Sequence, residues 1–172
     1  MIYKNIDRVF DWEKEVYDKL KKAGDGLSKE KANCKLSSKS WTLKQIFEHI
    51  VLVEEKTLML ITKLLERAGA NKENTEESIS LDSIISRVKG RKIKALERYE
   101  PTGKLSLKDS LNRLDEIHDD LRNLKPLRLS SVTFPHWLFG KMNLGQWTAF
   151  FVLHEERHLK QIESMLEKLP VD

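Results

Sequence analysis

Apolar residues recur at spacings of three and four along four long stretches of the chain, a pattern that predicts amphipathic helices. The four stretches cover residues 6–24, 42–69, 106–125 and 143–170. A shorter apolar stretch at 81–88 predicts a minor helix before Gly90. Four long helices of this kind predict an all-α protein with a four-helix bundle, and 172 residues suit a single domain that spans 1–172.

The ends of these helices carry recognisable capping signals. Thr42 with Gln45, and Asn143 with Gln146, have the spacing of a capping box, in which each side chain bonds the backbone of the other residue. Residues 24–40 are polar and predict a loop, whereas 127–141 predict an ordered loop because of their aromatic residues. The segment between the second and third helices, 69–105, is long enough to cross the bundle, so a simple up-down-up-down connection is not required.

Composition narrows the class of protein. The low content of glycine (7) and proline (4) disfavours turn-rich β folds, and 34% charged residues exclude a membrane-embedded chain. The net charge of +4 comes from interspersed lysine and glutamate, so we expect no nucleic-acid partner and no membrane partner. Cys34 is a lone cysteine and no signal peptide is evident at the start, which together predict a cytoplasmic protein.

Three histidines lie on apolar helix faces. His154 and His158 are four residues apart, one helical turn, and His49 shares the buried stripe of the second helix. Each one alone could be a core histidine that is hydrogen-bonded to a neighbour. Three buried imidazoles together cost desolvation, which one divalent cation would compensate for all of them. Three nitrogen ligands leave an open coordination position, as in catalytic metal sites.

Two segments resemble the DinB-like (DinB/YfiT-like) family of helical-bundle metalloproteins. They are Trp-Thr-Leu-Lys-Gln-Ile-Phe-Glu-His at 41–49 and Asn-Leu-Gly-Gln-Trp at 143–147, the latter followed by His154 and His158. The resemblance implies up-down-down-up topology with a long crossover between helices 2 and 3. It also implies a divalent metal ion, usually zinc or nickel, held by His49, His154 and His158.

The same resemblance implies an activity class. Relatives include transferases that use a low-molecular-weight thiol, and others are described as metal-dependent hydrolases. We therefore expect a metal-dependent transferase or hydrolase that acts on a small molecule, with a thiol as cosubstrate in the first case. Because metal binding needs neutral imidazoles, it is expected to weaken below about pH 6.5. A non-catalytic metal-binding or interaction bundle remains the alternative from another class.

A competing interpretation comes from residues 154–158, His-Glu-Glu-Arg-His, which match the His-Glu-x-x-His pattern of zinc proteases. Glu155 would then be the general base, and it is the one weak candidate for a catalytic acid or base. Few residues follow His158 to supply a third ligand, and no strand-rich region is predicted for binding a peptide. Glu155 also lies about 100° around the helix from His154, toward solvent or a neighbouring helix.

Other residues receive more limited expectations. Arg157 and Gln161 flank the histidine pair and are candidates for orienting ligands or binding substrate. His118 is expected at the edge of the apolar face of the third helix, solvated or capping, and His136 receives no role. Trp147, Phe150 and Phe151 are predicted to belong to the core. An exposed apolar loop residue such as Trp137 makes a homodimer plausible.

Overall fold

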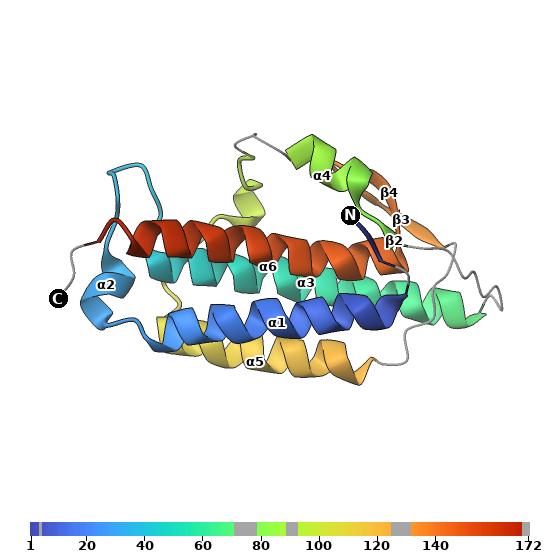
Figure 1. Cartoon of the computed structure of the whole chain (residues 1–172), viewed down its shortest axis with the longest axis horizontal. Helices are drawn as coiled ribbons and strands as arrows, with labels where there is room; N and C mark the ends of the chain where they lie inside the picture. Colours follow the sequence, from blue (N-terminus) through green and yellow to red (C-terminus); the bar gives the residue numbers. More distant parts are fainter. Residues whose placement is uncertain (4, 71–78, 89–92, 125–131, 170–172) are drawn as a thin grey trace.

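Four long helices form a four-helix bundle in the computed structural model, which describes residues 1–3, 5–70, 79–88, 93–124 and 132–169 (Figure 1). The long helices are α1 (Ile6–Asp25), α3 (Leu43–Ala70), α5 (Leu107–Asn123) and α6 (Leu144–Leu166). The predicted all-α bundle class is therefore confirmed. None of the helices over the described residues combines the length and the apolar character needed to cross a bilayer.

Two of the long helices run in one direction along the bundle, and the other two run in the opposite direction. Followed by their colours in Figure 1, α1 and α6 point one way along the bundle, and α3 and α5 point the other way. Helix α6 packs against both α1 and α3, and α5 packs against α3 and more lightly against α1. This arrangement is the up-down-down-up topology that the family resemblance implies, because α3 and α5 are parallel neighbours joined by a long crossover.

The described part of the crossover between α3 and α5 contains three short elements. These are strand β2 (Ile79–Ser80), helix α4 (Asp82–Val88) and the 3₁₀ turn η1 (Glu97–Tyr99). Strand β2 pairs antiparallel with β1 (Ile2–Tyr3) at the N-terminus, with Ile2 opposite Ser80. Helix α4 matches the minor helix predicted for residues 81–88.

Local capping explains where two of the long helices begin. The Thr42 hydroxyl accepts the backbone N–H of Gln45 at 3.2 Å, and the Gln45 side chain accepts the backbone N–H of Thr42 at 3.0 Å. Asn143 and Gln146 form the same reciprocal pair at the start of α6. Both predicted capping boxes are present. Helix α6 ends at Leu166, earlier than expected. The two prolines predicted to follow the third and fourth long helices, Pro126 and Pro170, lie outside the described residues.

Two expected loops contain regular structure. The 24–40 segment includes the short helix α2 (Lys29–Asn33), which the Ser28 hydroxyl caps. Within the expected 127–141 loop, of which 127–131 lie outside the described residues, β3 (Thr133–His136) pairs antiparallel with β4 (Gly140–Asn143). Gly140 has φ of 77°, a left-handed conformation that glycine adopts without strain and that helps the chain reverse between the strands.

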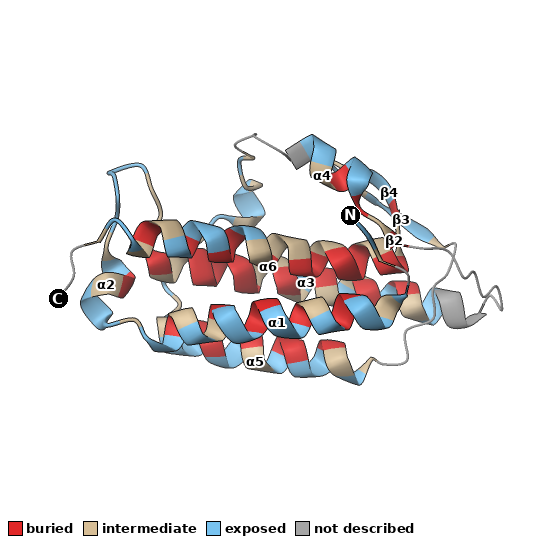
Figure 2. Ribbon diagram, in the orientation of Figure 1, coloured by how far each residue is buried: buried red, intermediate tan, exposed pale blue. Residues whose placement is uncertain are grey.

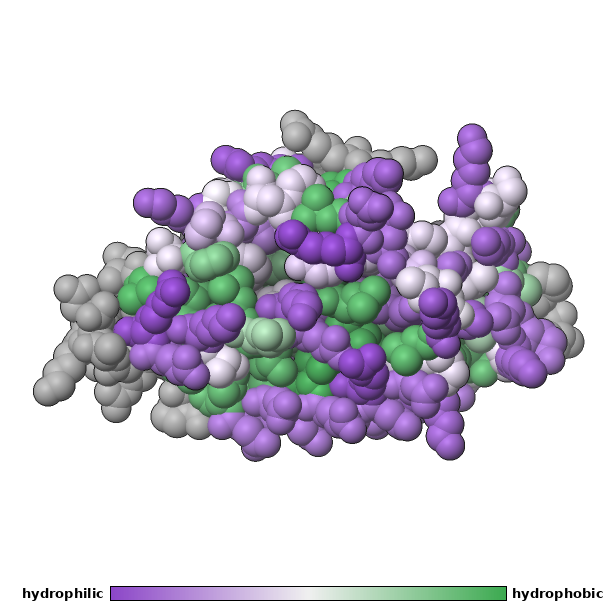
Figure 3. Space-filling view, turned by 180° about the vertical axis from the view of Figure 1, so that it is seen from behind, coloured by the Kyte–Doolittle hydropathy of each residue, from purple (hydrophilic) through white to green (hydrophobic). Residues whose placement is uncertain are grey.

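Buried residues line the inward faces of the four helices, and exposed residues lie on their outer faces (Figure 2). Phe47 and Phe151 are the largest fully buried side chains of this core. Seen from behind, the molecule exposes apolar side chains along its middle between hydrophilic ones (Figure 3). The core also holds buried charged or titratable residues on all four long helices: Glu13, Glu48, His49, Glu54, His118, Glu155 and His158.

Candidate metal centre

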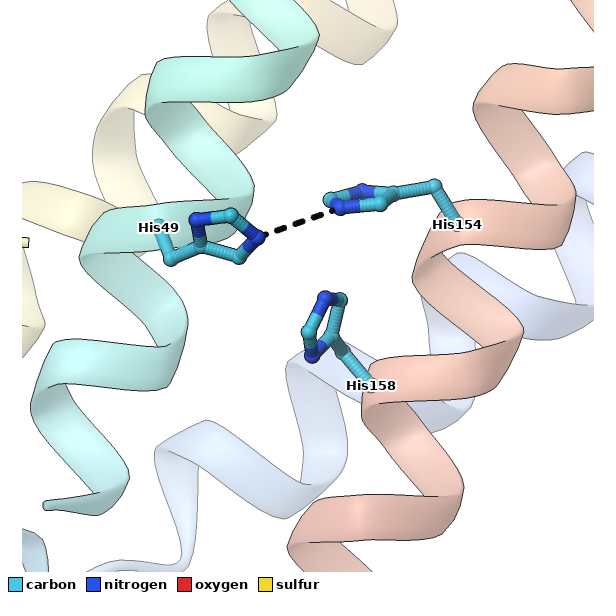
Figure 4. Close-up of side chains that lie close together, drawn as sticks. All are labelled: His49, His154 and His158. Atoms are coloured by element: carbon cyan, nitrogen blue, oxygen red, sulfur yellow. Dashed lines mark hydrogen bonds between the residues drawn. The ribbon is translucent and has the colours of Figure 1, made fainter. Parts of the chain in front are cut away.

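Three imidazoles from two antiparallel helices converge between α3 and α6 (Figure 4). His49 comes from α3, and His154 and His158 lie one turn apart on α6. One ring nitrogen from each residue lies within 4.8 Å of the others. The Nε2 atoms of His49 and His154 are 3.4 Å apart. Two nitrogen ligands about 2.0–2.1 Å from a tetrahedral zinc ion would be separated by about 3.4 Å, so the spacing of this pair fits a shared cation.

The Nδ1 atom of each imidazole faces a different group. His49 Nδ1 lies 2.7 Å from the backbone carbonyl oxygen of Tyr99, to which it donates in the Nδ1–H tautomer. His158 Nδ1 in the same way donates to Gln161 Oε1 at 2.9 Å. His154 Nδ1 lies 3.8 Å from Glu54 Oε1 and makes no hydrogen bond among the described residues. These contacts leave the three Nε2 atoms available to one ion, with carbonyl, amide and carboxylate oxygens behind them.

The crossover is held against α3 beside His49. The buried carboxylate of Glu48 accepts the backbone N–H groups of Thr102 and Gly103, at 3.2 and 2.6 Å, and the Thr102 hydroxyl at 2.8 Å. Gly103 has φ of 75°, so this turn uses the conformational freedom of glycine. The anchored turn follows Tyr99 closely in the chain and so keeps the Tyr99 carbonyl at the His49 ring.

Burial controls the protonation of the three histidines. It lowers the pKa of His49, lowers the pKa of His154 well below its usual value, and lowers the pKa of His158 to about 3. All three are therefore neutral at pH 7, the form that binds metal. The expectation that protons begin to compete near pH 6.5 needs correction, because these lowered pKa values move that competition to a more acidic pH.

A cavity of about 1270 Å³ opens beside the histidines, with all three in its wall. Residues of the crossover and of the β3–β4 hairpin line its other sides. Aromatic side chains in the wall include Trp41, Tyr99, Phe139, Trp147 and Phe150. The basic side chains in the wall are Lys39, Lys56, Lys94, Arg98, Arg157 and Lys160. Among the described lining residues the one carboxylate is Glu156, which pairs with Lys160 at 3.2 Å, so the cavity favours anionic ligands.

Arg157 and Gln161 both lie in the cavity wall. Gln161 contacts His158, as described above, and so has the position of a residue that orients a ligand. Arg157 has no ion-pair partner among the described residues, and burial lowers the pKa of its guanidinium from the usual value. An unpaired guanidinium beside three histidines can bind a carboxylate or another anion.

Glu155 is turned away from this cavity. Its side chain is fully buried, and Oε1 lies 2.7 Å from Nε2 of His118 on the neighbouring helix α5. Of the two orientations that the sequence left open, the structure shows the one toward a neighbouring helix. A general base must reach the reacting group, so this placement argues against the zinc-protease interpretation of residues 154–158.

The expectation for His118 was wrong. Its side chain is fully buried, stacked on Tyr17 with ring centroids 3.6 Å apart, and lies between Glu13 and Glu155. Burial alone would lower its pKa, but the charge of Glu155 and the hydrogen bonds with Glu13 and Glu155 raise the pKa of His118 to about 9. The sequence contained a signal for this cluster, because Glu13 follows Val9 by four residues and His118 follows Leu114 by four, on apolar stripes.

Two of the three aromatic residues predicted for the core lie in it, and the third lines the cavity. Trp147 and Phe151 are buried as predicted, whereas Phe150 is half-buried and lines the cavity. His136, to which no role was assigned from the sequence, also lines the cavity. Its Nδ1 accepts the backbone N–H groups of Leu138 and Phe139 at 3.1 and 3.3 Å, and burial lowers its pKa to about 4.

Comparison with known proteins agrees with this architecture. A family model described as the DinB superfamily matches residues 14–162. The uncharacterized protein YuaE of Bacillus subtilis (strain 168) is 27% identical over 160 residues, which cover 90% of this chain and 93% of YuaE.

Two solved structures share the fold. TT2238, described as a four-helix bundle protein, superposes with a TM-score of 0.63 at 20% identity, over 93% of this chain and 99% of that one. Bacillus subtilis YfiT, described as a probable metal-dependent hydrolase with an unusual four-helix bundle topology, superposes with a TM-score of 0.61 at 18% identity, over 95% and 86%. The family match spans most of the bundle and includes all three histidines, and the chain belongs to the DinB superfamily.

Proposed function

We propose that this protein is a metal-dependent enzyme in which His49, His154 and His158 hold one divalent cation, zinc or nickel. The observation that carries the proposal is the convergence of three neutral imidazoles in the wall of a large cavity. Three protein ligands leave coordination positions for a substrate atom, and the cavity gives a small molecule access to them. A structural metal site would instead be closed by a fourth protein ligand.

The reaction that the cavity supports best is transfer to a low-molecular-weight thiol. A divalent cation in this position supplies a positive charge that lowers the pKa of a thiol or a water molecule near it. A thiol starts from a pKa of about 8.5 and needs little further help to ionise, whereas water is a much weaker acid. The cavity wall offers little help with hydrolysis, because Glu155 faces His118 and Glu156 pairs with Lys160. Hydrolysis of a small molecule is the second candidate, supported by the description of YfiT.

The side chains of the cavity suit the two substrates of such a transfer. Arg157 binds an anionic group of the thiol, and the aromatic wall formed by Trp147, Phe150 and their neighbours packs against an apolar electrophile. The thiol releases its proton to solvent, its sulfur forms a bond to an electrophilic carbon, and the leaving group departs with its electron pair. We infer a cytoplasmic location, where free thiols are maintained.

The test uses the Cys34→Ser variant, because Cys34 is the one cysteine of the chain and would itself react with electrophiles. The metal-loaded protein is incubated with several anionic and neutral thiols and 1-chloro-2,4-dinitrobenzene, and in parallel with a nitrophenyl ester. We expect the protein to consume a thiol in a metal-dependent reaction, and we expect the His49→Ala and His158→Ala variants to lose this activity. Ester turnover without thiol transfer would support the hydrolase instead. Inactivity in both assays would favour a non-catalytic metal-binding bundle.

A further inference from the structure

A second group of buried ionisable side chains lies in the bundle core, beside the histidine triad. Each long helix contributes one residue: Glu13 from α1, Glu54 from α3, His118 from α5 and Glu155 from α6. None of the four side chains is more than 1% exposed. We call these four residues the four-helix cluster; the function proposed above does not use it.

His118 is the centre of the four-helix cluster. Its Nδ1 pairs with Glu13, whose carboxylate also accepts hydrogen bonds from Arg122 at 2.9 and 3.3 Å. Its Nε2 points the other way, 2.7 Å from Glu155 Oε1 and 3.9 Å from Glu54 Oε2. In many metal sites, a histidine donates one ring N–H to a carboxylate and binds the metal through its other ring nitrogen. His118 has this arrangement, with Nδ1 at Glu13 and Nε2 toward the carboxylates of Glu155 and Glu54.

Several oxygens of the cluster lack partners. Both carboxylate oxygens of Glu54, and Oε2 of Glu155, are buried without a hydrogen bond among the described residues. Burying such oxygens is costly unless a cation or a proton compensates them. The nearby positive groups are Arg122, which bonds Glu13, and His118 itself. Glu54 therefore lies farther from a cationic group than the other two carboxylates, at 3.9 Å from His118 Nε2, and burial raises its pKa well above the usual value, which favours a proton on it in the absence of a cation.

We propose that Glu54, Glu155 and His118 Nε2 form a second divalent cation site, with Glu13 orienting the His118 ring. One potential ligand atom from each of the three lies within 4.8 Å of the others. Two carboxylates and one imidazole suit Mn²⁺ or Fe²⁺ better than the three imidazoles of the triad do. Burial and the neighbouring charge of Glu155 raise the pKa of Glu54 well above its usual value, so a cation bound here replaces the Glu54 proton as well as the Nε2 proton of His118, and both protons pass to solvent.

Glu54 lies between the two sites. Its Oε2 faces His118, and its Oε1 lies 3.8 Å from His154 Nδ1. The second site nevertheless needs no metal at the triad, because none of its three ligands belongs to the triad. The two proposals can therefore fail separately.

The experiment removes the triad and keeps the second site. In a His49→Ala/His158→Ala variant, Mn²⁺ is titrated and the free ion is followed by its EPR signal. We expect about one bound Mn²⁺ per chain, and at least a tenfold weaker affinity when Glu54→Gln is added. The matched control is Glu55→Gln, the same change one residue along α3, where the carboxylate pairs with Arg113 outside the cluster. This control should keep its Mn²⁺ affinity.

Thermal unfolding provides a second measurement that does not depend on the triad variants. In the otherwise unchanged chain, Glu54→Gln should leave the metal-free midpoint equal or higher, because it removes a buried carboxylate without partners. The rise in midpoint that Mn²⁺ causes should shrink in Glu54→Gln and persist in Glu55→Gln. Failure of the triad variant to bind Mn²⁺, or the same binding with and without Glu54→Gln, would overturn the second site and show that protons alone satisfy the cluster.

Discussion

At the scale of single residues, the three candidate ligands differ in what holds their rings. A backbone carbonyl faces His49, an amide oxygen faces His158, and the Glu54 carboxylate faces His154. Such partners set which ring nitrogen is free and increase its basicity. Gln161 is a ligand of neither proposed site, so its contribution to the triad can be measured separately.

Replacing Gln161 with leucine should weaken metal binding about 10- to 100-fold, because the His158 ring loses the acceptor for its Nδ1–H. Gln161→Glu keeps an oxygen in the same place and should retain most of the affinity. Competition with a chromogenic chelator measures both variants. Equal metal affinity of the leucine variant and the unchanged protein would show that Gln161 does not contribute to the site.

Arg157→Gln should raise the KM for an anionic thiol about tenfold and leave kcat nearly unchanged, because the guanidinium binds the substrate and takes no part in bond breaking. A neutral thiol serves as the control and should show no such rise. Steady-state kinetics with both thiols distinguishes the two cases. A similar rise for both would mean that Arg157 maintains the shape of the cavity instead.

Metal-free protein should lose stability as the pH falls below 6.5. Burial lowers the folded-state pKa of His158 to about 3, so protons bind the unfolded chain first, and the stability present above pH 6.5 is lost progressively below it. By pH 5.5 this loss is about 1.4 kcal/mol for one such histidine. Between pH 7.5 and pH 5.5, urea unfolding should show a smaller loss of the free energy of unfolding for His158→Gln than for the unchanged protein. The same loss in both proteins would contradict a lowered pKa of His158 in the folded state.

The four-helix cluster could not be predicted from the sequence. Glutamate is rarely buried, so nothing in the sequence singled out Glu13 or Glu54, and Glu155 was expected to face solvent or a neighbouring helix. Glu13 nevertheless follows the apolar spacing of its helix and is buried. The pattern shows that such a residue points inward, but not which side chain from another helix meets it. Pairing between helices depends on packing, which one sequence does not specify.

At the scale of elements, local chemistry was the most predictable part. The capping boxes at Thr42 and Asn143 involve residues three apart, and the structure has both. The β3–β4 hairpin was missed, because its strands are four residues each and β3 contains Pro135, which disfavours a strand assignment. Short strands of this kind depend on what they pack against.

The anchor between the crossover and α3 predicts the effect of Glu48→Gln. The charged carboxylate accepts three hydrogen bonds from Thr102 and Gly103, and hydrogen bonds to charged groups are the stronger ones. Loss of the charge should lower the free energy of unfolding by about 2 kcal/mol and loosen the turn beside Tyr99. Urea unfolding, with hydrogen exchange of the Gly103 amide, measures both effects. An unchanged free energy of unfolding would show that the crossover is held elsewhere.

At the scale of the whole molecule, the periodicity of the sequence predicted four helices but not their directions. Helical period is the same for a helix that runs up or down, so the parallel arrangement of α3 and α5 came from the family resemblance and from the long crossover. This topology sets α3 antiparallel to α6, which brings His49 opposite His154 and His158. The fold thus creates the candidate metal centre from residues about a hundred positions apart.

The most direct test of the central claim is the metal content of the purified protein after saturation with zinc and removal of free ion. Because Glu155→Gln removes a ligand of the proposed second site and keeps the Glu54 carboxylate beside His154, the comparison is made in that background, with and without His49→Ala/His158→Ala. We predict about one zinc ion per chain with the triad intact and almost none without it. Equal zinc content in the two proteins would contradict the three-histidine site.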